Sequence, residues 1–256
     1  MRLVSLVWLA GALAACGSSV DSGADAAAEA AADGAGTSDG GGADAGAEVG
    51  APDAGADASI GAADVLAKLG ACKELTTSRY KTDDAPSSPA DVPVCGLVNA
   101  VWFTADMDVD CDGKQTAQCN PNTDPAFQNQ TAAVDSKNQP LDAANLPYVV
   151  VPSPSARWDY RTGPLQMGSV VLVIWKGKMQ FGVLGDTGPT AIIGEASYAM
   201  ASALGANPDP KVGGIDAKEV TYLLFTGKSG VVTKNEDHAE AVSVGQARLA
   251  QFMKEN

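Results

Sequence analysis

The stretch that decides the fold is residues 180–204, QFGVLGDTGPTAIIGEASYAMASAL. An apolar segment runs into Gly185-Asp186-Thr187-Gly188-Pro189, where glycine and proline predict a turn at the end of a strand. Glu195 follows nine residues after Asp186 and opens a run of helix formers that stops at Gly205. We therefore expect Asp186 where a sheet ends and Glu195 in the first turn of a helix.

Two carboxylates on rigid flanking elements are what glycosidic bond cleavage requires. One carboxyl group protonates the leaving oxygen, and the other activates water or attacks the sugar directly. The structural alternative is that Asp186 serves as a turn residue and Glu195 as an acid favoured by the helix dipole. Taken alone, the pair fits that alternative well.

Longer sequence segments around this pair resemble those of the fungal-type chitosanases of glycoside hydrolase family 75. The matching segments are VWFTADMDVDCDG at 101–113, DPAFQ at 124–128, QTAA at 130–133, PLDAANLPYVVVP at 140–152, GDTGP at 185–189 and IIGEASYAMA at 192–201. The resemblance extends from about Asn99 to about Thr226. It implies that Asp186 and Glu195 are the catalytic pair, that the polymer cut is chitosan, and that hydrolysis inverts the anomeric configuration.

The proposed roles follow from the surroundings expected for the pair. Glu195 is assigned as the general acid, with a pKa raised by partial burial and by the neighbouring carboxylate, and Asp186 as the general base. A position at the start of a helix would oppose that rise for Glu195, so the two roles could be exchanged. Neither a metal nor an organic cofactor is expected.

The pattern of the chain predicts a mainly β fold with a few helices. Strands are expected at 98–109, 148–151, 170–175, 179–184 and 220–225, with further pairing at 231–233, and helices at 60–69, 196–204 and 243–254. Residues 176–178, Lys-Gly-Lys, predict a hairpin turn. Because the Asp-Thr-Gly loop resembles that of barrel-type lytic transglycosylases, we expect a six-stranded double-psi β-barrel in one catalytic domain, residues 63–256.

Residues 106–113, DMDVDCDG, form an acidic run. Alternation along a strand would place Asp106, Asp108 and Asp110 on one face, where carboxylates could bind the ammonium groups of glucosamine. A calcium site is the alternative, because D-x-D-x-D-G at 108–113 copies the start of an EF-hand loop. The twelfth position of that loop would be Cys119 instead of Glu, so we favour the substrate-binding interpretation.

Aromatic and polar residues supply further substrate-binding candidates. Trp158 and Tyr160 lie in a loop rich in proline and glycine, where they could form a platform for sugar rings. Packing in the core is the alternative for both side chains. Gln128, Thr131 and Thr187 are candidates for contacts with sugar hydroxyl groups.

The amino-terminal segment predicts an exported lipoprotein. Residues 1–16 combine Arg2, an apolar run and the sequence Leu-Ala-Ala-Cys, which resembles a bacterial lipobox with Cys16 as the lipidated residue. A plain secretory signal is the alternative. Because Gly17 and not Asp follows Cys16, the resemblance points to the outer membrane. Residues 17–62 are almost wholly Ala, Gly, Ser and Asp, which predicts a disordered linker.

Charge and cysteine content are in keeping with this location. Residues 63–256 carry a net charge of about −6, which disfavours nucleic acid and favours a cationic partner such as chitosan. Four cysteines remain beyond Cys16 and allow three pairings. We favour Cys111 with Cys119 and Cys72 with Cys95. Metal binding by these thiols is the competing use, but the chain contains one His.

Two further function classes remain open at this point. A peptidoglycan lytic transglycosylase would use a single Asp and an N-acetylated polymer. A polysaccharide-binding surface lipoprotein would keep the acidic groove without turnover. In each case we expect a monomer whose only contact with a membrane is the lipid.

Overall fold

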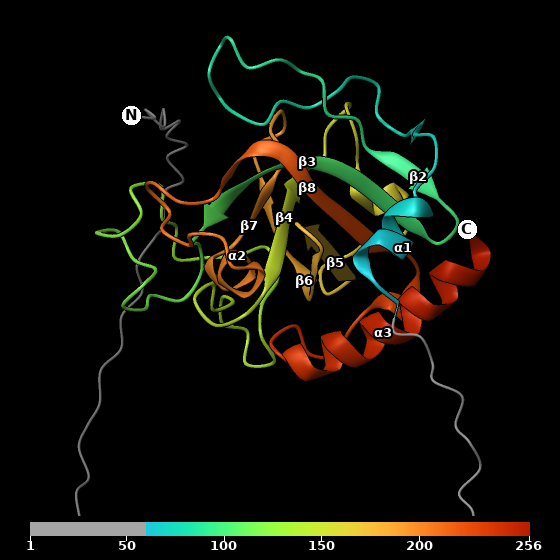
Figure 1. The fold of residues 1–256 in the computed structure, drawn as a ribbon. Coiled ribbons are helices and arrows are strands. Elements are labelled where there is room, and N and C mark those ends of the chain that lie inside the picture. Colours follow the sequence, from blue (N-terminus) through green and yellow to red (C-terminus); the bar gives the residue numbers. More distant parts are fainter. Residues whose placement is uncertain (1–59) are drawn as a thin grey trace, which may run out of the picture. The chain divides into compact units, whose positions relative to one another are not determined.

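Six strands close into a barrel in the order β3-β7-β4-β6-β5-β8, and β8 pairs back to β3 (Figure 1). The computed structural model describes residues 60–256. The barrel strands are β3 Ala100–Asp110, β4 Tyr148–Pro152, β5 Val170–Trp175, β6 Lys178–Gly188, β7 Glu195–Ser197 and β8 Ile215–Phe225. The pairs β3–β7 and β4–β6 are parallel, and the other neighbours are antiparallel. The expected mainly β fold with a six-stranded barrel is confirmed.

Alternation along the strands separates two hydrophobic cores. In β5, Val171 and Val173 belong to a cluster with members from all six strands, which fills the barrel; we call it the inner core. Leu172 and Ile174 belong to a second cluster outside the barrel, the outer core. Both faces of β5 are therefore covered, which explains why its sequence reads as a continuous apolar run.

The β5–β6 hairpin forms as predicted. Trp175 pairs with Lys178, and the two residues between them, Lys176 and Gly177, both have positive φ. This is the geometry of a type I′ turn, whose twist matches that of the flanking strands. The expected pairing at residues 231–233 is also present as a single bridge between Ser169 and Val231.

Two helices cover the outer core. α3, His238–Glu255, lies along the outside of the barrel, and α1, Ala62–Ala67, lies near it (Figure 1). α3 begins five residues before the predicted start because the Asp237 side chain accepts a hydrogen bond from the Glu240 backbone N–H at 2.9 Å. Within residues 60–256, no helix is both long and apolar enough to span a bilayer.

The expectation that Glu195 lies in the first turn of a helix is wrong. Helix α2 spans Tyr198–Leu204, and its N-cap is Ser197, whose side chain accepts a hydrogen bond from the Met200 N–H. Glu195 instead opens strand β7, which pairs with β3 on one side and β4 on the other. Glu195 thus lies inside the sheet, so the helix dipole gives no reason to exchange the two catalytic roles.

Two disulfides fasten the segments that flank β3. Cys72 is bonded to Cys95 and Cys111 to Cys119, so both favoured pairings are confirmed. The first links two short strands at the barrel edge, β1 Lys73–Glu74 and β2 Cys95–Leu97, which the sequence pattern does not reveal.

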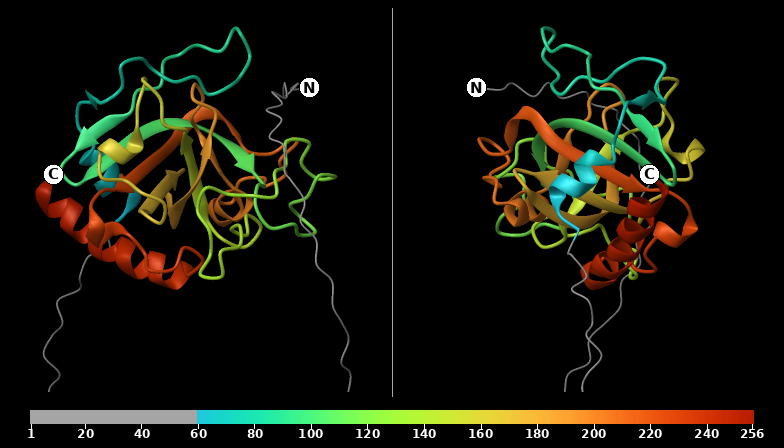
Figure 2. Two further views of the ribbon diagram at one scale, coloured as in Figure 1. Left: turned by 180° about the vertical axis from the view of Figure 1, so that it is seen from behind. Right: turned by 45° about the vertical axis from the view of Figure 1, so that its right-hand side comes forward.

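The connection between β3 and β4 is a long segment without regular helices or strands. Residues 111–147, drawn in green, gather at the carboxyl end of β3, away from the carboxyl end of α3 (Figure 2). The predicted signal peptide and nearly all of the predicted linker lie outside the described residues. Ile60, the first described residue, packs against the outer core.

Candidate active site

A single row of residues crosses four strands of the barrel. Asp108 on β3 pairs with Glu195 on β7, Glu195 pairs with Val150 on β4, and Val150 pairs with Asp186 on β6. Paired residues on neighbouring strands project from the same face of a sheet. Since neighbouring strands are about 4.8 Å apart, the Cα atoms of Asp186 and Glu195 are separated by roughly 10 Å, with Val150 between them.

A bulge in β6 brings Asp186 to this face. Val149 pairs with Leu184 and Val150 with Asp186, which leaves Gly185 as the extra residue. Val149 and Leu184 belong to the inner core, so strict alternation would turn Asp186 inward as well. The extra residue shifts the inward and outward alternation of side chains along β6 by one position. The Asp186 side chain is therefore directed outward, beside that of Val150.

The Asp186 carboxylate is oriented by the backbone. Its Oδ1 atom accepts hydrogen bonds from the Ala132 N–H at 2.8 Å and from the Thr187 N–H at 2.7 Å. Burial raises the pKa of Asp186, and these two donors counteract the rise. The pKa of Asp186 stays above its usual value, while the two donors fix the carboxyl group and leave its second oxygen for other partners.

Glu195 lies in a more strongly perturbed environment. Burial raises the pKa of its carboxyl group to about 8, and the nearby Asp110, Asp108 and Asp186 add to the rise. A Cβ atom on Gly188 would lie 2.5 Å from Glu195 Oε2, so the Glu195 side chain extends across β4 towards β6. Glu195 therefore stays protonated near neutral pH and lies beside the strand that carries Asp186.

A buried tyrosine contacts the Asp110 carboxylate and the Asp112 backbone at the end of β3. Tyr148 Oη lies 3.2 Å from Asp110 Oδ2 and 2.9 Å from the carbonyl oxygen of Asp112. The Asp112 N–H donates to Asp110 Oδ1 at 2.7 Å. Burial raises the pKa of Asp110 to about 7, and repulsion from Asp186 adds to that rise. Burial raises the pKa of Asp112 to about 9, and repulsion from Asp110 adds to that rise. The site thus concentrates carboxyl groups that are costly to ionise together.

A cavity of about 300 Å³ opens beside Asp186. It is lined by Asp112, Gln128, Gln130, Thr131, Ala132, Asp186 and Thr187. The cavity therefore brings together one expected catalytic residue and the three expected hydroxyl-binding candidates, Gln128, Thr131 and Thr187. The Thr131 hydroxyl already donates to the Ala133 carbonyl oxygen and accepts from the Leu141 N–H, so its proton is committed to the cavity wall.

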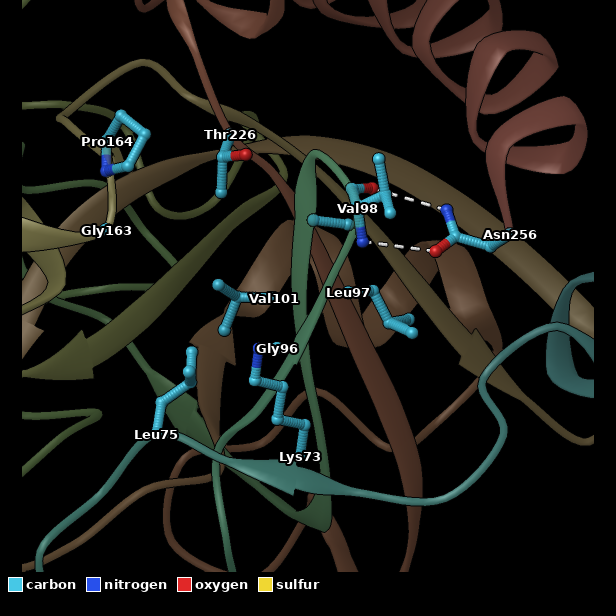
Figure 3. A pocket seen from close by; sticks show the side chains of 11 residues that line it. Lys73, Leu75, Gly96, Leu97, Val98, Val101, Gly163, Pro164, Thr226 and Asn256 are labelled. Carbon is cyan, nitrogen blue, oxygen red and sulfur yellow. Dashed lines mark hydrogen bonds between the residues drawn. The ribbon is translucent and has the colours of Figure 1, made fainter.

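A larger cavity, of about 490 Å³, lies near the opposite end of β3 (Figure 3). Its wall includes Leu75 and Val101, and the Asn256 side chain hydrogen-bonds to the Val98 backbone at its rim. None of its lining residues is Asp or Glu. The smaller cavity is therefore the one of the two with carboxyl groups in its wall, those of Asp112 and Asp186, while Glu195 is not among its lining residues.

The alternative calcium loop does not form as an EF-hand. Asp108 and Asp110 lie on strand β3, whereas an EF-hand requires a helix on either side of its loop. Among the described residues, no group of three or more His, Cys, Asp or Glu side chains is arranged to hold a metal ion.

Comparison with known proteins agrees with this acid-rich site. Residues 107–253 match the family described as fungal chitosanase of glycosyl hydrolase group 75. The chain belongs to glycosyl hydrolase group 75. It is 32% identical over 205 residues to endo-chitosanase B from Aspergillus oryzae, a match that covers 71% of this chain and 85% of the relative.

Other relatives match in part. The chain is 27% identical over 174 residues to an endo-chitosanase from Aspergillus fumigatus, covering 63% of this chain and 73% of the relative. It is 35% identical over 136 residues to endo-chitosanase C from Aspergillus oryzae, covering 52% of this chain but 33% of that relative. The group 75 chain thus spans about a third of the length of the latter protein.

Three expected substrate-binding residues of this group 75 enzyme are buried. Trp158 and Tyr160 are 6% and 7% exposed and pack edge to face in the inner core, so the expectation of an exposed aromatic platform is wrong. Asp106 is 2% exposed, so Asp106, Asp108 and Asp110 do not form one open face. A shift in the β3–β8 register between Ala105 and Met107 interrupts the alternation on which that expectation rested.

Two residues of the group 75 site were not assigned to it from the sequence. Asp112 appeared in the sequence only as part of a calcium motif, yet it shares the cavity with Asp186. The sequence places Tyr148 in a run of apolar strand residues, yet its hydroxyl group contacts the Asp110 carboxylate and the Asp112 carbonyl oxygen. The acidic run was a usable signal for Asp112. For Tyr148 the sequence offers none, because its contacts depend on how the fold brings the start of β4 close to the end of β3.

Proposed function

We propose that this chain is an endo-acting chitosanase that hydrolyses β-1,4 linkages between glucosamine units with inversion of the anomeric configuration. The observation that carries the proposal is the placement of Asp186 and Glu195 on one face of the barrel, separated by a single strand. Group 75 membership supplies the substrate class.

The separation of the pair favours inversion over retention. Residues two apart on an extended strand, such as Asp186 and Gly188, have Cα atoms about 6.7 Å apart, and the Glu195 carboxyl group lies beside Gly188. Inverting glycosidases hold their carboxyl groups about 6.5 to 9.5 Å apart, whereas retaining enzymes hold them at about 5 to 5.5 Å. A carboxyl separation in the wider range would leave room for a water molecule beside the base.

The protonation states fit the two roles. Glu195, with a pKa raised to about 8 by burial, carries the proton that the leaving glycosidic oxygen takes as the bond breaks. Asp186, oriented by two backbone N–H donors that counteract the rise of its pKa on burial, removes a proton from the water that attacks the anomeric carbon from the opposite face. Proton exchange with solvent then restores both groups.

Substrate contacts follow from the cavity wall. The Gln128 and Thr187 side chains are available for sugar hydroxyl groups, and Thr131 shapes the wall. The excess of carboxylates suits a polymer that carries ammonium groups in mildly acidic solution. No cofactor enters the proposed reaction, and a monomer contains every residue that it uses.

Export and lipid anchoring complete the proposal. The two disulfides indicate an oxidising compartment. The residues before Cys16 support processing as a lipoprotein, with the acyl chains on Cys16 holding the enzyme at the outer membrane.

Release of reducing ends from chitosan, chitin and peptidoglycan tests the activity, and NMR of the first products tests the stereochemistry. Chitosan should be cut, and the new reducing ends should appear first as the α-anomer. Asp186→Asn and Glu195→Gln should each lose nearly all turnover while keeping the melting temperature and oligomer binding. Cleavage of peptidoglycan alone, or near-normal rates in either variant, would overturn the proposal.

A further inference from the structure

Among the described residues, no salt bridge joins Lys or Arg to the carboxylates around the cavity. In residues 60–256, the ion pairs of Lys and Arg involve acids elsewhere, such as Asp135 with Lys114 and Asp91 with Lys218. Asp110, Asp112, Asp186 and Glu195 repel one another instead. A cation bound among them would remove much of the cost of ionising them together.

The hydrogen bonds distinguish which carboxylate is available to such a cation. Both oxygens of Asp110 are occupied, one by the Asp112 N–H and the other by the Tyr148 hydroxyl group. Asp112 Oδ1 accepts from the Gln128 N–H at 2.6 Å, and no neighbour in the described chain hydrogen-bonds to Oδ2. Asp112 also lines the cavity, whereas Asp108 and Asp110 do not.

Asp112 is held firmly enough to select a ligand. Its carbonyl oxygen accepts a hydrogen bond from Tyr148 Oη, its N–H is bound to Asp110, and the Cys111–Cys119 disulfide constrains the backbone immediately before it. With its backbone constrained and its carboxylate held by the Gln128 N–H, Asp112 loses little conformational entropy when it binds a cation.

We infer that Asp112 recognises the ammonium group of the glucosamine unit whose anomeric carbon is attacked. The inference rests on the proposed function, because it takes Asp186 as the base that activates water at that carbon. In glucosamine the amine is on C2, directly beside the anomeric carbon C1. A side chain that binds this amine must therefore line the same cavity as the side chain that acts at C1. Asp112 and Asp186 line the same cavity.

The test compares Asp112→Asn with the wild type on fully deacetylated and on partly N-acetylated chitosan. Asparagine keeps an oxygen for the Gln128 N–H, so the variant should melt like the wild type. Its kcat/KM on deacetylated chitosan should fall by on the order of tenfold or more, mainly through KM, as for a lost charge-assisted hydrogen bond. The loss on acetylated substrate should be much smaller, because an acetamide group has no positive charge.

Two controls sharpen the comparison. Asp84→Asn removes one negative charge from an exposed residue outside the cavity lining and should leave the substrate preference unchanged. Asp108→Asn tests the neighbouring carboxylate that faces Glu195. A change of preference in Asp108→Asn with none in Asp112→Asn would overturn the inference.

Calorimetric binding separates the inference from the proposed function. Glucosamine oligomers are titrated into Glu195→Gln and into the double variant that also carries Asp112→Asn. Weaker binding by the double variant, with a reduced dependence on NaCl, supports recognition by Asp112 even if wild-type turnover on chitosan is absent. Equal binding by the two proteins overturns the inference, and wild-type cleavage of chitosan would still support the proposed function.

Discussion

Replacing Gly188 with alanine tests whether the position of the Glu195 carboxyl group sets the rate. The added Cβ would lie 2.5 Å from Glu195 Oε2 and 3.3 Å from Val150 Cγ1. Since uncrowded carbon contacts are about 3.5 Å or longer, the oxygen must move by about 1 Å. Misplacing a reacting group by that distance costs on the order of a hundredfold in rate, or about 2.7 kcal/mol in the barrier.

The fold itself should tolerate Gly188→Ala. Gly188 is not among the glycines with positive φ, so alanine can adopt its backbone conformation. The crowded atom is the end of a side chain, which can turn aside. We therefore expect the melting temperature to change by a few degrees at most while kcat on chitosan falls by about a hundredfold.

Gly163→Ala is the matched control for this experiment. Its Cβ would meet only the Tyr160 carbonyl oxygen, at 3.8 Å, and its φ of −104° suits alanine. Reducing-end release and thermal melting are measured for both variants alongside the wild type. A kcat for Gly188→Ala within about threefold of the control would refute the argument that Gly188 provides space for the general acid.

Two further predictions concern pH and location. The folded protein holds the pKa values of Asp110, Glu195 and Asp112 at about 7, 8 and 9, above their unfolded values of about 4, so it binds more protons than the unfolded chain in that interval. The melting temperature should therefore fall as pH rises from about 4 to about 9, and a steady rise in calorimetry would contradict the assigned burial. Cys16→Ser should move the protein from membranes into the soluble fraction, and retention on membranes in detergent-free fractionation would exclude the lipid anchor.

Local patterns were sufficient for the β5–β6 hairpin. Residues 170–175 form a strand over the predicted range, and the turn at Lys176 and Gly177 has the φ angles that its sequence favours. Both signals lie within a few residues of each other. No distant segment is needed to interpret them.

Strand β7 could not be predicted in this way. Its three residues precede a run of strong helix formers, and their extended conformation comes from pairing with β3 and β4. Pairing between segments far apart in sequence leaves no local periodicity. The sequence pattern therefore assigned Ala196 to a helix, although the resemblance of residues 192–201 to group 75 identified Glu195 as a candidate acid.

The residues that line the site also divide into those that the sequence identifies and those that tertiary packing decides. Gln128 and Thr187 were identified by their place in segments that resemble group 75, and both line the cavity. Trp158 was assigned to a sugar platform by residue type alone, but packing inside the barrel decides its position. Residue type indicates which chemistry is available, and tertiary packing determines which side chains reach the cavity.

The position of Glu195 in β7 links the lifetime of the enzyme to the integrity of its barrel. In the described part of the chain, β7 joins β3 to β4 in the closed ring of strands, so the backbone of the proposed general acid cannot move away without opening the ring. Heat inactivation should then coincide with cooperative melting, without an earlier loosening of the site. Substitutions that strengthen β3 or β4, even far from the sugar, would extend the working life of the catalyst at elevated temperature.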